Sequence, residues 1–183
     1  MSTTGPEPAD LAGVVAVLRE ADAQEEPNEE IVGLSILHHG LQCAARLRRS
    51  DPDDPELQVA GLLHDLGHVL RPGCEDIHGA VGARFVRPVF GARVAAIIEG
   101  HVAAKRYLVT VDPSYRARLS EGSLRTLTLQ GETMTPAEVD RFRSSAHSAA
   151  AVRLRRADED SKDPGATVPP LESWMDALAR LAG

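Results

Sequence analysis

Residues 62–68 read LLHDLGH, and this stretch decides the interpretation of the whole chain. Two histidines and an aspartate stand among leucines in a segment whose other residues predict a buried helix. Burying a carboxylate costs free energy unless a cation or hydrogen bonds compensate it, and a metal ion bound by His64 and Asp65 would do so. His68 follows His64 by four residues, so we expect both on one helix face. The stretch therefore predicts a metal site inside a helical core.

Helical periodicity continues on both sides of this stretch. We expect helices over residues 8–24, 28–49 with Asn28 as the cap, 56–68, 78–108 with a break near Pro88, 112–120, 123–130, 135–160 and 170–182. The clearest start is TPAE at residues 135–138, which has the pattern of a capping box. Alternating β-branched runs are missing from the sequence. We predict an all-α protein with one domain over residues 1–183, in which the metal-binding core spans about 28–162.

The composition narrows the classes of function. Of the 183 residues, 43% are hydrophobic and only 3% aromatic, so the core must be built from aliphatic side chains, which favours helices. The formal net charge of −7 argues against nucleic-acid binding, which needs a basic face. The N-terminal MSTTGPEPAD lacks the features of a signal peptide, and no apolar run approaches the ~18 residues that span a bilayer. We expect a cytoplasmic protein without membrane association or an obligate protein partner, with Cys43 and Cys74 reduced.

Further polar residues stand at apolar positions of the expected helices. His39, His78, His101 and Asp158 join His64 and Asp65 as candidate metal ligands. Imidazole and carboxylate groups suit Fe, Mn, Co, Ni or Zn, and the lack of cysteine in the set argues against a structural zinc site. Six candidates suit two ions, because the carboxylate of an adjacent His-Asp pair can bridge ions ~3.5–4 Å apart.

The order His39, His64-Asp65, Asp158 resembles the H…HD…D signature of the HD-domain superfamily, an all-helical metal-binding fold. Longer stretches resemble one branch of it, the mixed-valent diiron oxygenases that cleave the carbon–phosphorus bond of hydroxylated phosphonates. These stretches are HHGLQCA (38–44), LLHDLGH (62–68), HGAVGARFV (78–86), HVAAKRYL (101–108), LSEGSLRTLTLQG (119–131) and RLRRADEDSK (153–162). The resemblance implies an HD-type helical bundle with an Fe(II)/Fe(III) pair that uses O2 as co-substrate, and a small anionic substrate, a phosphonate.

The resemblance also implies roles for individual residues. One iron would be held by His39, His64, Asp65 and Asp158, and the other by Asp65, His78 and His101. The substrate would contact His68, Lys105, Ser123 and Arg155, and His64, Asp65 and His68 would be the catalytic residues. The spacing agrees with this, because Lys105 follows His101 by four residues and Arg155 precedes Asp158 by three, about one helical turn each.

The chain departs from that branch in three places. Its relatives carry Tyr and Glu ten and seven residues before the first metal histidine, and the Glu helps to recognise a substrate amino group. Here these positions are Glu29, a possible extra metal ligand or a simple helix-start residue, and Val32. Ala157 stands where the relatives tend to have Trp. We therefore expect a hydroxyalkyl phosphonate, or a similar small anion, that lacks the usual amine or carries it elsewhere.

Two other functions fit parts of the pattern. An HD-type phosphohydrolase acting on a nucleotide or phosphate monoester would use the same H…HD…D core to activate water. A non-catalytic scaffold or sensor would explain the missing Tyr and Glu, but not a full set of ligands whose burial without ions is costly. His78, His101 and the stretches around Lys105 and Ser123 favour the oxygenase.

Overall fold

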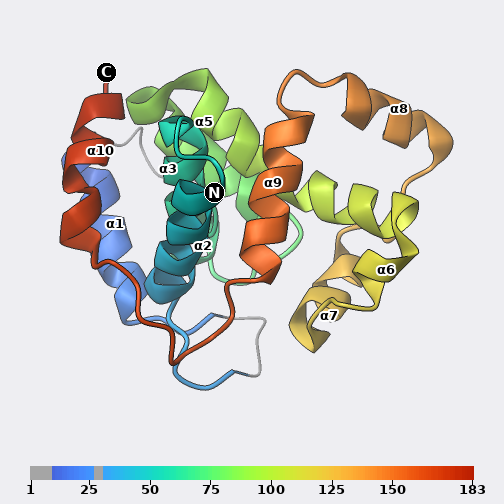
Figure 1. The fold of residues 1–183 in the computed structure, drawn as a ribbon, viewed down its shortest axis with the longest axis horizontal. Helices are drawn as coiled ribbons and strands as arrows, with labels where there is room; N and C mark the ends of the chain where they lie inside the picture. Colours follow the sequence, from blue (N-terminus) through green and yellow to red (C-terminus); the bar gives the residue numbers. More distant parts are fainter. Residues whose placement is uncertain (1–9, 27–30) are drawn as a thin grey trace, which may run out of the picture.

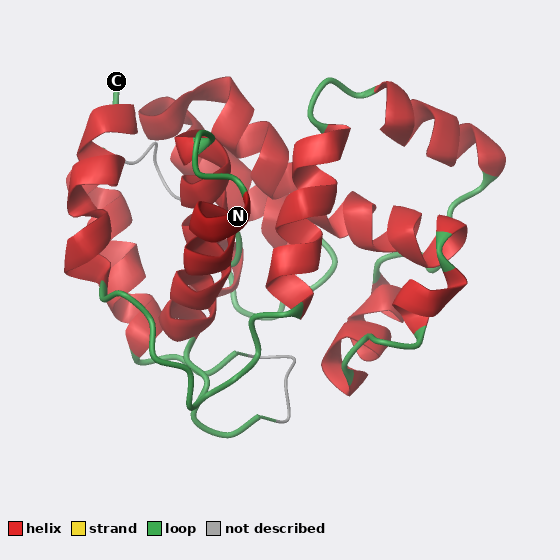
Figure 2. Ribbon diagram, in the orientation of Figure 1, coloured by secondary structure: helices red, strands yellow, loops and turns green. Residues whose placement is uncertain are grey.

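The computed structural model describes residues 10–26 and 31–183, and nearly all of their regular structure is helical (Figure 2). In chain order the elements are α1 (Leu11–Asp22), α2 (Ile36–Ser50), α3 (Pro55–Leu63), α4 (Leu66–Leu70), α5 (His78–Val111), α6 (Pro113–Arg116), α7 (Glu121–Leu129), α8 (Pro136–Ser144), α9 (Ser148–Glu159), the 3-10 helix η1 (Leu171–Trp174) and α10 (Met175–Leu181). One isolated β-bridge joins Glu25 to Ser35. The prediction of an all-α fold is confirmed.

The helices that carry the candidate ligands pack against one another in the middle of the molecule. In Figure 1, α2, α3 and α9 lie side by side with α5 behind them, and the contacts of α2 with α3, of α5 with α9 and of α2 with α9 hold this group together. The helices α1 and α10 cover one side, and α6, α7 and α8 form the opposite end. Segments far apart in the sequence therefore meet at the centre.

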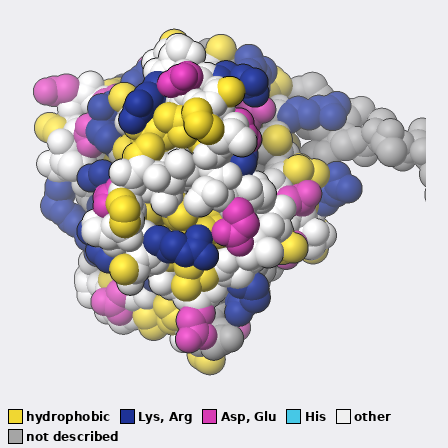
Figure 3. Space-filling model, turned by 90° about the vertical axis from the view of Figure 1, so that its right-hand side faces the viewer, with side chains coloured by type: hydrophobic (Ala, Val, Ile, Leu, Met, Phe, Trp, Pro, Cys, Tyr) yellow, Lys and Arg dark blue, Asp and Glu magenta, His cyan; other side chains and the backbone are white. Residues whose placement is uncertain are grey.

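Aliphatic side chains fill the core, as the composition predicts. The main cluster includes Leu47, Leu57, Ile97, Ile98 and Trp174, all of them at most 1% exposed. A second, smaller cluster lies under α6 and α7. The face at that end mixes basic, acidic and hydrophobic side chains (Figure 3). Among the described helices, none combines the length and hydropathy needed to cross a bilayer.

The start of α2 differs from the prediction. The helix begins at Ile36, with Ser35 as its N-cap, because the Ser35 hydroxyl accepts a hydrogen bond from His38 N at 3.0 Å. Gly33, at φ +87°, and the bridge between Glu25 and Ser35 hold the preceding residues in a non-helical path. The expected start at residue 28 is therefore wrong, while the cap Asn28 itself lies outside the described residues.

The predicted helix over residues 56–68 is interrupted at the His-Asp pair. The helix α3 ends at Leu63 and α4 restarts at Leu66, because Asp65 has the non-helical angles φ −102° and ψ 7°. His64 and His68 therefore belong to different helices, and the single shared face predicted for them is wrong. The break lets His64 and Asp65 point their side chains toward partners that a continuous helix would not reach.

Two further helix boundaries differ from the prediction. The long helix α5 bends at Gly91, where φ is +80°, whereas Pro88 is accommodated within it. The predicted helix over residues 135–160 divides into α8 and α9, because Ser145 is extended at φ −67° and ψ 133°. Serine hydroxyls compete for the backbone there, and Ser148 Oγ donates to Ser145 O at 2.9 Å. The capping box of Thr135 and Glu138 at the start of α8 is present as predicted.

Gly67 allows α4 to lie directly against the start of α5. A Cβ atom at this position would come within 2.0 Å of the carbonyl oxygen of His78. Any larger residue would push the two backbones apart. The glycine of LLHDLGH therefore sets the distance between His68 on α4 and His78 on α5.

Candidate metal centre and anion pocket

Four buried histidines are oriented in the same way, by a backbone carbonyl at Nδ1. His64 bonds Gly61 O at 2.9 Å, His78 bonds Glu75 O at 3.0 Å, His101 bonds Ile98 O at 2.6 Å and His39 bonds Ser161 O at 2.9 Å. A carbonyl oxygen can only accept, so each Nδ1 carries the proton. In the neutral form of each ring, the lone pair of Nε2 then faces the centre, which is the arrangement that a metal-binding histidine needs.

Asp65 lies between these histidines and faces a different pair with each oxygen. Its Oδ2 is 3.1 Å from His64 Nε2 and 3.4 Å from His39 Nε2. Its Oδ1 is 3.4 Å from His78 Nε2 and 3.8 Å from His101 Nε2. A carboxylate with one oxygen toward each of two imidazole pairs has the geometry of a bridge between two cations.

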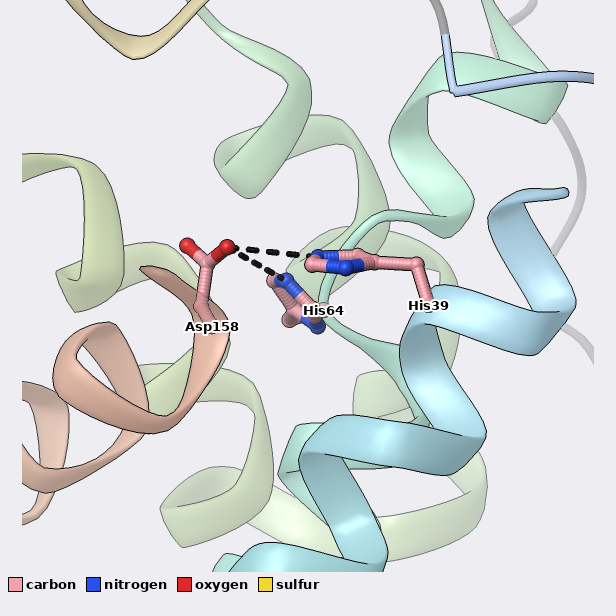
Figure 4. Close-up of side chains that lie close together, drawn as sticks. All are labelled: His39, His64 and Asp158. Carbon is pink, nitrogen blue, oxygen red and sulfur yellow. Dashed lines mark ion pairs between the residues drawn. The ribbon is translucent and has the colours of Figure 1, made fainter. Parts of the chain in front are cut away.

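Asp158 approaches the first pair from α9. Its Oδ1 is 3.2 Å from His39 Nε2 and 3.8 Å from His64 Nε2, as Figure 4 shows. His39 comes from α2 and His64 from the end of α3, so three separate elements meet at this point. These three side chains, all at most 4% exposed, form one group with the spacing of metal ligands.

The electrostatic surroundings of the first pair, His39 and His64, favour a positive charge at this position. Burial opposes ionisation, yet hydrogen bonds and attraction from Asp158 and Asp65 raise the pKa of His39 well above its ordinary value. The same balance of burial against attraction raises the pKa of His64, while the nearby histidines hold the pKa of Asp65 well below the usual range. In the protein alone, protons on the histidines supply the positive charge that a bound cation would replace.

In the second pair, His78 and His101, the pKa values shift in the opposite direction. Burial, together with the neighbouring His101 and His68, lowers the pKa of His78, and burial with His64 lowers the pKa of His101 to about 4. Both rings are therefore neutral near pH 7, and their Nε2 atoms lie 2.8 Å apart with their protons on Nδ1. Two lone pairs facing at this distance repel. Two nitrogens bound at ~2.1 Å to one ion, at right angles, would lie about 3 Å apart, so a shared cation fits the geometry.

The donor set therefore fits two transition-metal ions. Imidazole nitrogens with carboxylates suit iron, manganese, cobalt or zinc. The buried side chain of His64 supports this, since its Nε2 has no hydrogen-bond partner within the described chain. All six ligand candidates predicted from the sequence meet at this centre, although their roles as ligands stay a prediction. His68 lies beside them, with its ring stacked on His78 at 4.2 Å between centroids.

A small cavity opens beside the centre, and basic side chains form part of its lining. Lys105, Ser123 and Arg155 line it, as expected for substrate contacts. Lys105 Nζ donates to Thr126 Oγ1 at 2.7 Å, and burial with the neighbouring Arg155 lowers the pKa of Lys105 to about 7. A small anion would find two basic groups and a hydroxyl beside the candidate metal ligands.

Side-chain contacts hold the cationic groups in place. Arg155 donates to Tyr115 Oη at 2.8 Å and to Ser123 Oγ at 2.9 Å, and it also pairs with Asp158 and Glu159. Glu159 additionally accepts from Ser123 Oγ at 2.8 Å. The guanidinium therefore connects the anion pocket directly to a candidate metal ligand.

Sequence reasoning missed three residues of this site. Glu159 and Lys162 form an ion pair at 3.2 Å, and Lys162 lines the cavity. Their positions one helical turn from Arg155 and Asp158 were the available signal. The third is Glu26, which is 8% exposed and lies with His39 and Asp65 in a group that could hold a metal ion. Burial and the repulsion of Asp65 raise the pKa of Glu26 to about 8.

Of the three positions where the chain departs from that branch, the structure describes Val32 and Ala157, and neither lines the cavity. Val32 is 85% exposed, and it does not line the cavity. Glu29, the possible extra ligand, lies outside the described residues. Ala157 is buried in the main core next to Asp158, where it packs without reaching the site. His38, which the sequence left as structural, bonds Ala166 O at 2.9 Å with Nε2.

Comparisons with known proteins found a matching family and similar sequences. The HD domain family matches residues 34–129. A hydroxymethylphosphonate dioxygenase from Gimesia maris is 39% identical over 147 residues, which cover 75% of this chain and 73% of that protein. A 1-hydroxy-2-(trimethylamino)ethylphosphonate dioxygenase (glycine-betaine-forming) from Leisingera caerulea is 32% identical over 164 residues, covering 84% of this chain and 83% of that protein.

Proposed function

Because this chain belongs to the HD domain family, we propose that it is an oxygenase that uses two iron ions and O2 to cleave the carbon–phosphorus bond of a small hydroxylated phosphonate. Two relatives that it matches over most of their length are named phosphonate dioxygenases. One observation carries the proposal: the two oxygens of Asp65 face separate histidine pairs at the edge of a cationic cavity. A single-ion site would not need such a bridge.

The residues present would hold the two ions as follows. His39, His64 and Asp158 would bind one ion, His78 and His101 would bind the other, and Asp65 would bridge them. When bound, the iron pair supplies the redox chemistry with O2. The carbonyl contacts at Nδ1 fix the ring orientations in advance, so little reorganisation is needed when the ions enter.

The cationic side of the cavity would bind the phosphonate. Arg155 brings a fixed positive charge and the one N–H of Nη1 that its contacts with Tyr115, Ser123, Asp158 and Glu159 leave over, and Lys105 adds a point charge from α5. The Ser123 hydroxyl lies 2.9 Å from Arg155, and its proton, which Glu159 accepts in the protein alone, would turn to a phosphonate oxygen when the anion binds. These contacts would place the carbon next to phosphorus beside the metal centre, which lowers the entropic part of the barrier.

His68 has a position suited to the substrate and not only to a metal. Its Nδ1 is buried and has no hydrogen-bond partner among the described residues. Burial lowers the pKa of His68, so the ring is neutral near pH 7 and can donate from one nitrogen while accepting at the other. We assign His68 to orienting the substrate hydroxyl or a phosphonate oxygen.

The reaction balances without an added reductant. For hydroxymethylphosphonate, one O2 gives formate and phosphate, with the carbon–phosphorus bond broken and one new oxygen bonded to each fragment. The carbon is oxidised and O2 is reduced. We favour a substrate of this kind, without an ammonium group, because Val32 faces solvent and cannot supply the carboxylate that relatives use for one.

Phosphate release in the presence and absence of O2 tests the proposal. The protein, loaded with iron under anaerobic conditions, is mixed with hydroxymethylphosphonate and then exposed to O2. We expect phosphate and formate in equal amounts only after O2 is added, and a mixed-valent diiron EPR signal that the substrate perturbs. Oxygen-independent release of phosphate from phosphate monoesters, with no turnover of the phosphonate, would overturn the proposal in favour of a phosphohydrolase.

A further inference from the structure

Glu26 is a buried carboxylate that the proposed reaction does not account for. It precedes α2, outside any helix, and only 8% of its surface is exposed. Backbone hydrogen bonds fix its position, because Glu26 N donates to Leu34 O at 2.8 Å and Ile36 N donates to Gln24 O at 2.9 Å. This pairing holds Glu26 beside the first turns of α2, the helix that carries His39.

The neighbours of Glu26 are candidate metal ligands. One oxygen of Glu26, a ring nitrogen of His39 and an oxygen of Asp65 all lie within 4.8 Å of one another. The Oε2 atom of Glu26 is buried and makes no hydrogen bond to any described residue. In its ionised form, a buried carboxylate next to the carboxylate of Asp65 costs free energy unless a cation lies between the two groups.

We infer that Glu26 is a further ligand of the ion held by His39, His64 and Asp158. The inference rests on the proposed function only for the presence of that ion. With Asp65, this ion then has five protein ligands, three of them carboxylates, whereas the ion at His78 and His101 has three. The two metal sites are therefore unequal, and removing Glu26 should weaken one of them and spare the other.

A substrate ammonium is the other cation that could neutralise Glu26. The two possibilities respond differently to substitution. A ligand to the ion affects metal affinity in the absence of any substrate. A partner for an ammonium group affects only the preference between phosphonates with and without that group.

Anaerobic Fe(II) titration of the full chain without substrate tests the inference. Glu26→Gln keeps the shape of the side chain but removes its charge, and Glu25→Gln is the matched control, because Glu25 is the neighbouring exposed carboxylate. We expect Glu25→Gln to bind two ions, each with the affinity that it has in the wild type. Glu26→Gln should bind one ion as before and the other at least about tenfold more weakly, since even indirect changes around a metal cost 10–100-fold.

A second variant separates a missing ligand from a damaged fold. Glu26→Ala leaves a space that added formate can fill, so formate should restore the weakened site in this variant and have no effect on the wild type. An unchanged titration curve in Glu26→Gln overturns the inference. So does a loss in Glu26→Ala that formate does not restore. Unchanged metal affinity with a lost preference for ammonium-bearing phosphonates overturns it in favour of the substrate role.

The same measurements separate this inference from the proposed reaction. A wild type that releases phosphate with O2, together with an unchanged Glu26→Gln titration, overturns the assignment of Glu26 alone. A wild type that binds two ions but turns over no phosphonate overturns the proposed reaction. In that case the titrations of Glu26→Gln and Glu25→Gln still decide whether Glu26 is a ligand.

Discussion

The two sides of the cavity are built in different ways. On the metal side, each of the four histidines is oriented by a backbone carbonyl, and for His64, His78 and His101 that carbonyl lies only three residues earlier in the chain. On the anion side, Arg155 and Lys162 are oriented by the side chains of Ser123 and Glu159. The first arrangement follows from local helix geometry, and the second depends on side chains meeting across the fold.

This difference predicts that the two sides can be disabled separately. Backbone contacts survive most substitutions, so metal binding should depend on the ligand side chains themselves. A network of side chains shares its contacts, so each substitution on the anion side should weaken binding by a moderate amount. Four substitutions or conditions, taken from the largest expected effect to the smallest, test this contrast.

Substitution of the bridging residue should have the largest effect. Asp65→Asn keeps the shape of the side chain, but a neutral amide cannot bridge two cations, so we expect phosphate release to fall about a thousandfold or more and the metal content to drop below two. Elemental analysis and a phosphate assay on the same sample measure both. A variant that keeps two ions and a tenth of the activity would show that Asp65 is not a bridge.

Substitution of Arg155 should weaken substrate binding on the anion side and leave metal binding unchanged. Arg155→Lys keeps the charge but loses the planar set of donors that bonds Tyr115 and Ser123 and holds the charge in the pocket. We expect kcat/KM to fall by roughly a hundredfold, mainly through KM, with two ions still bound. Steady-state kinetics and metal analysis check this. If Arg155→Lys loses an ion, its contact with Asp158 is essential and the two sides are not separable.

The pH dependence of KM should report on Lys105. In the free protein its pKa is about 7, because burial and Arg155 disfavour the charged form. A bound phosphonate favours the charged form, so binding takes up a proton and weakens as the pH rises above 7, by up to about tenfold per pH unit. Lys105→Arg stays charged and should flatten the profile. The ionisation of the phosphonate itself affects both proteins equally, so equal slopes would contradict the prediction.

Removal of the serine hydroxyl should have the smallest effect. Ser123→Ala removes a group that bonds both Arg155 and Glu159 but carries no charge. Arg155 and Glu159 keep their direct ion pair without this hydroxyl, so we expect a loss of only about 1 kcal/mol and a KM that rises about fivefold, with kcat and metal content unchanged. A large fall in kcat at constant KM would mean that Ser123 acts on the reaction and not on binding.

The proposed metal side was largely predictable from the sequence, because its histidines are oriented by local helix geometry. His64, His78 and His101 stand at polar exceptions in apolar helices, and helical spacing alone indicates that they face inward. The six predicted ligands do converge. The break between α3 and α4 was not predictable, because a two-residue interruption hardly changes the apolar periodicity on either side.

The anion side was predictable only in part. Lys105 and Arg155 could be found through their spacing from candidate ligands, but Glu159 and Lys162 have the composition of a solvated surface. Their partner Ser123 is more than thirty residues away in the chain, and periodicity does not report such a contact. Glu26 lies in a segment without helical pattern, so nothing in its neighbourhood marked it as buried.

The hydrogen bond from His39 Nδ1 to the carbonyl of Ser161 joins residues 122 positions apart. On a ribosome, the chain up to His101 can emerge and its helices can form long before Ser161 is synthesised. Until Ser161 is synthesised, the ring of His39 lacks the carbonyl oxygen that orients its Nδ1 atom. If His39 is the ligand that we propose, loading of an ion at this position would therefore follow synthesis of the chain through Ser161.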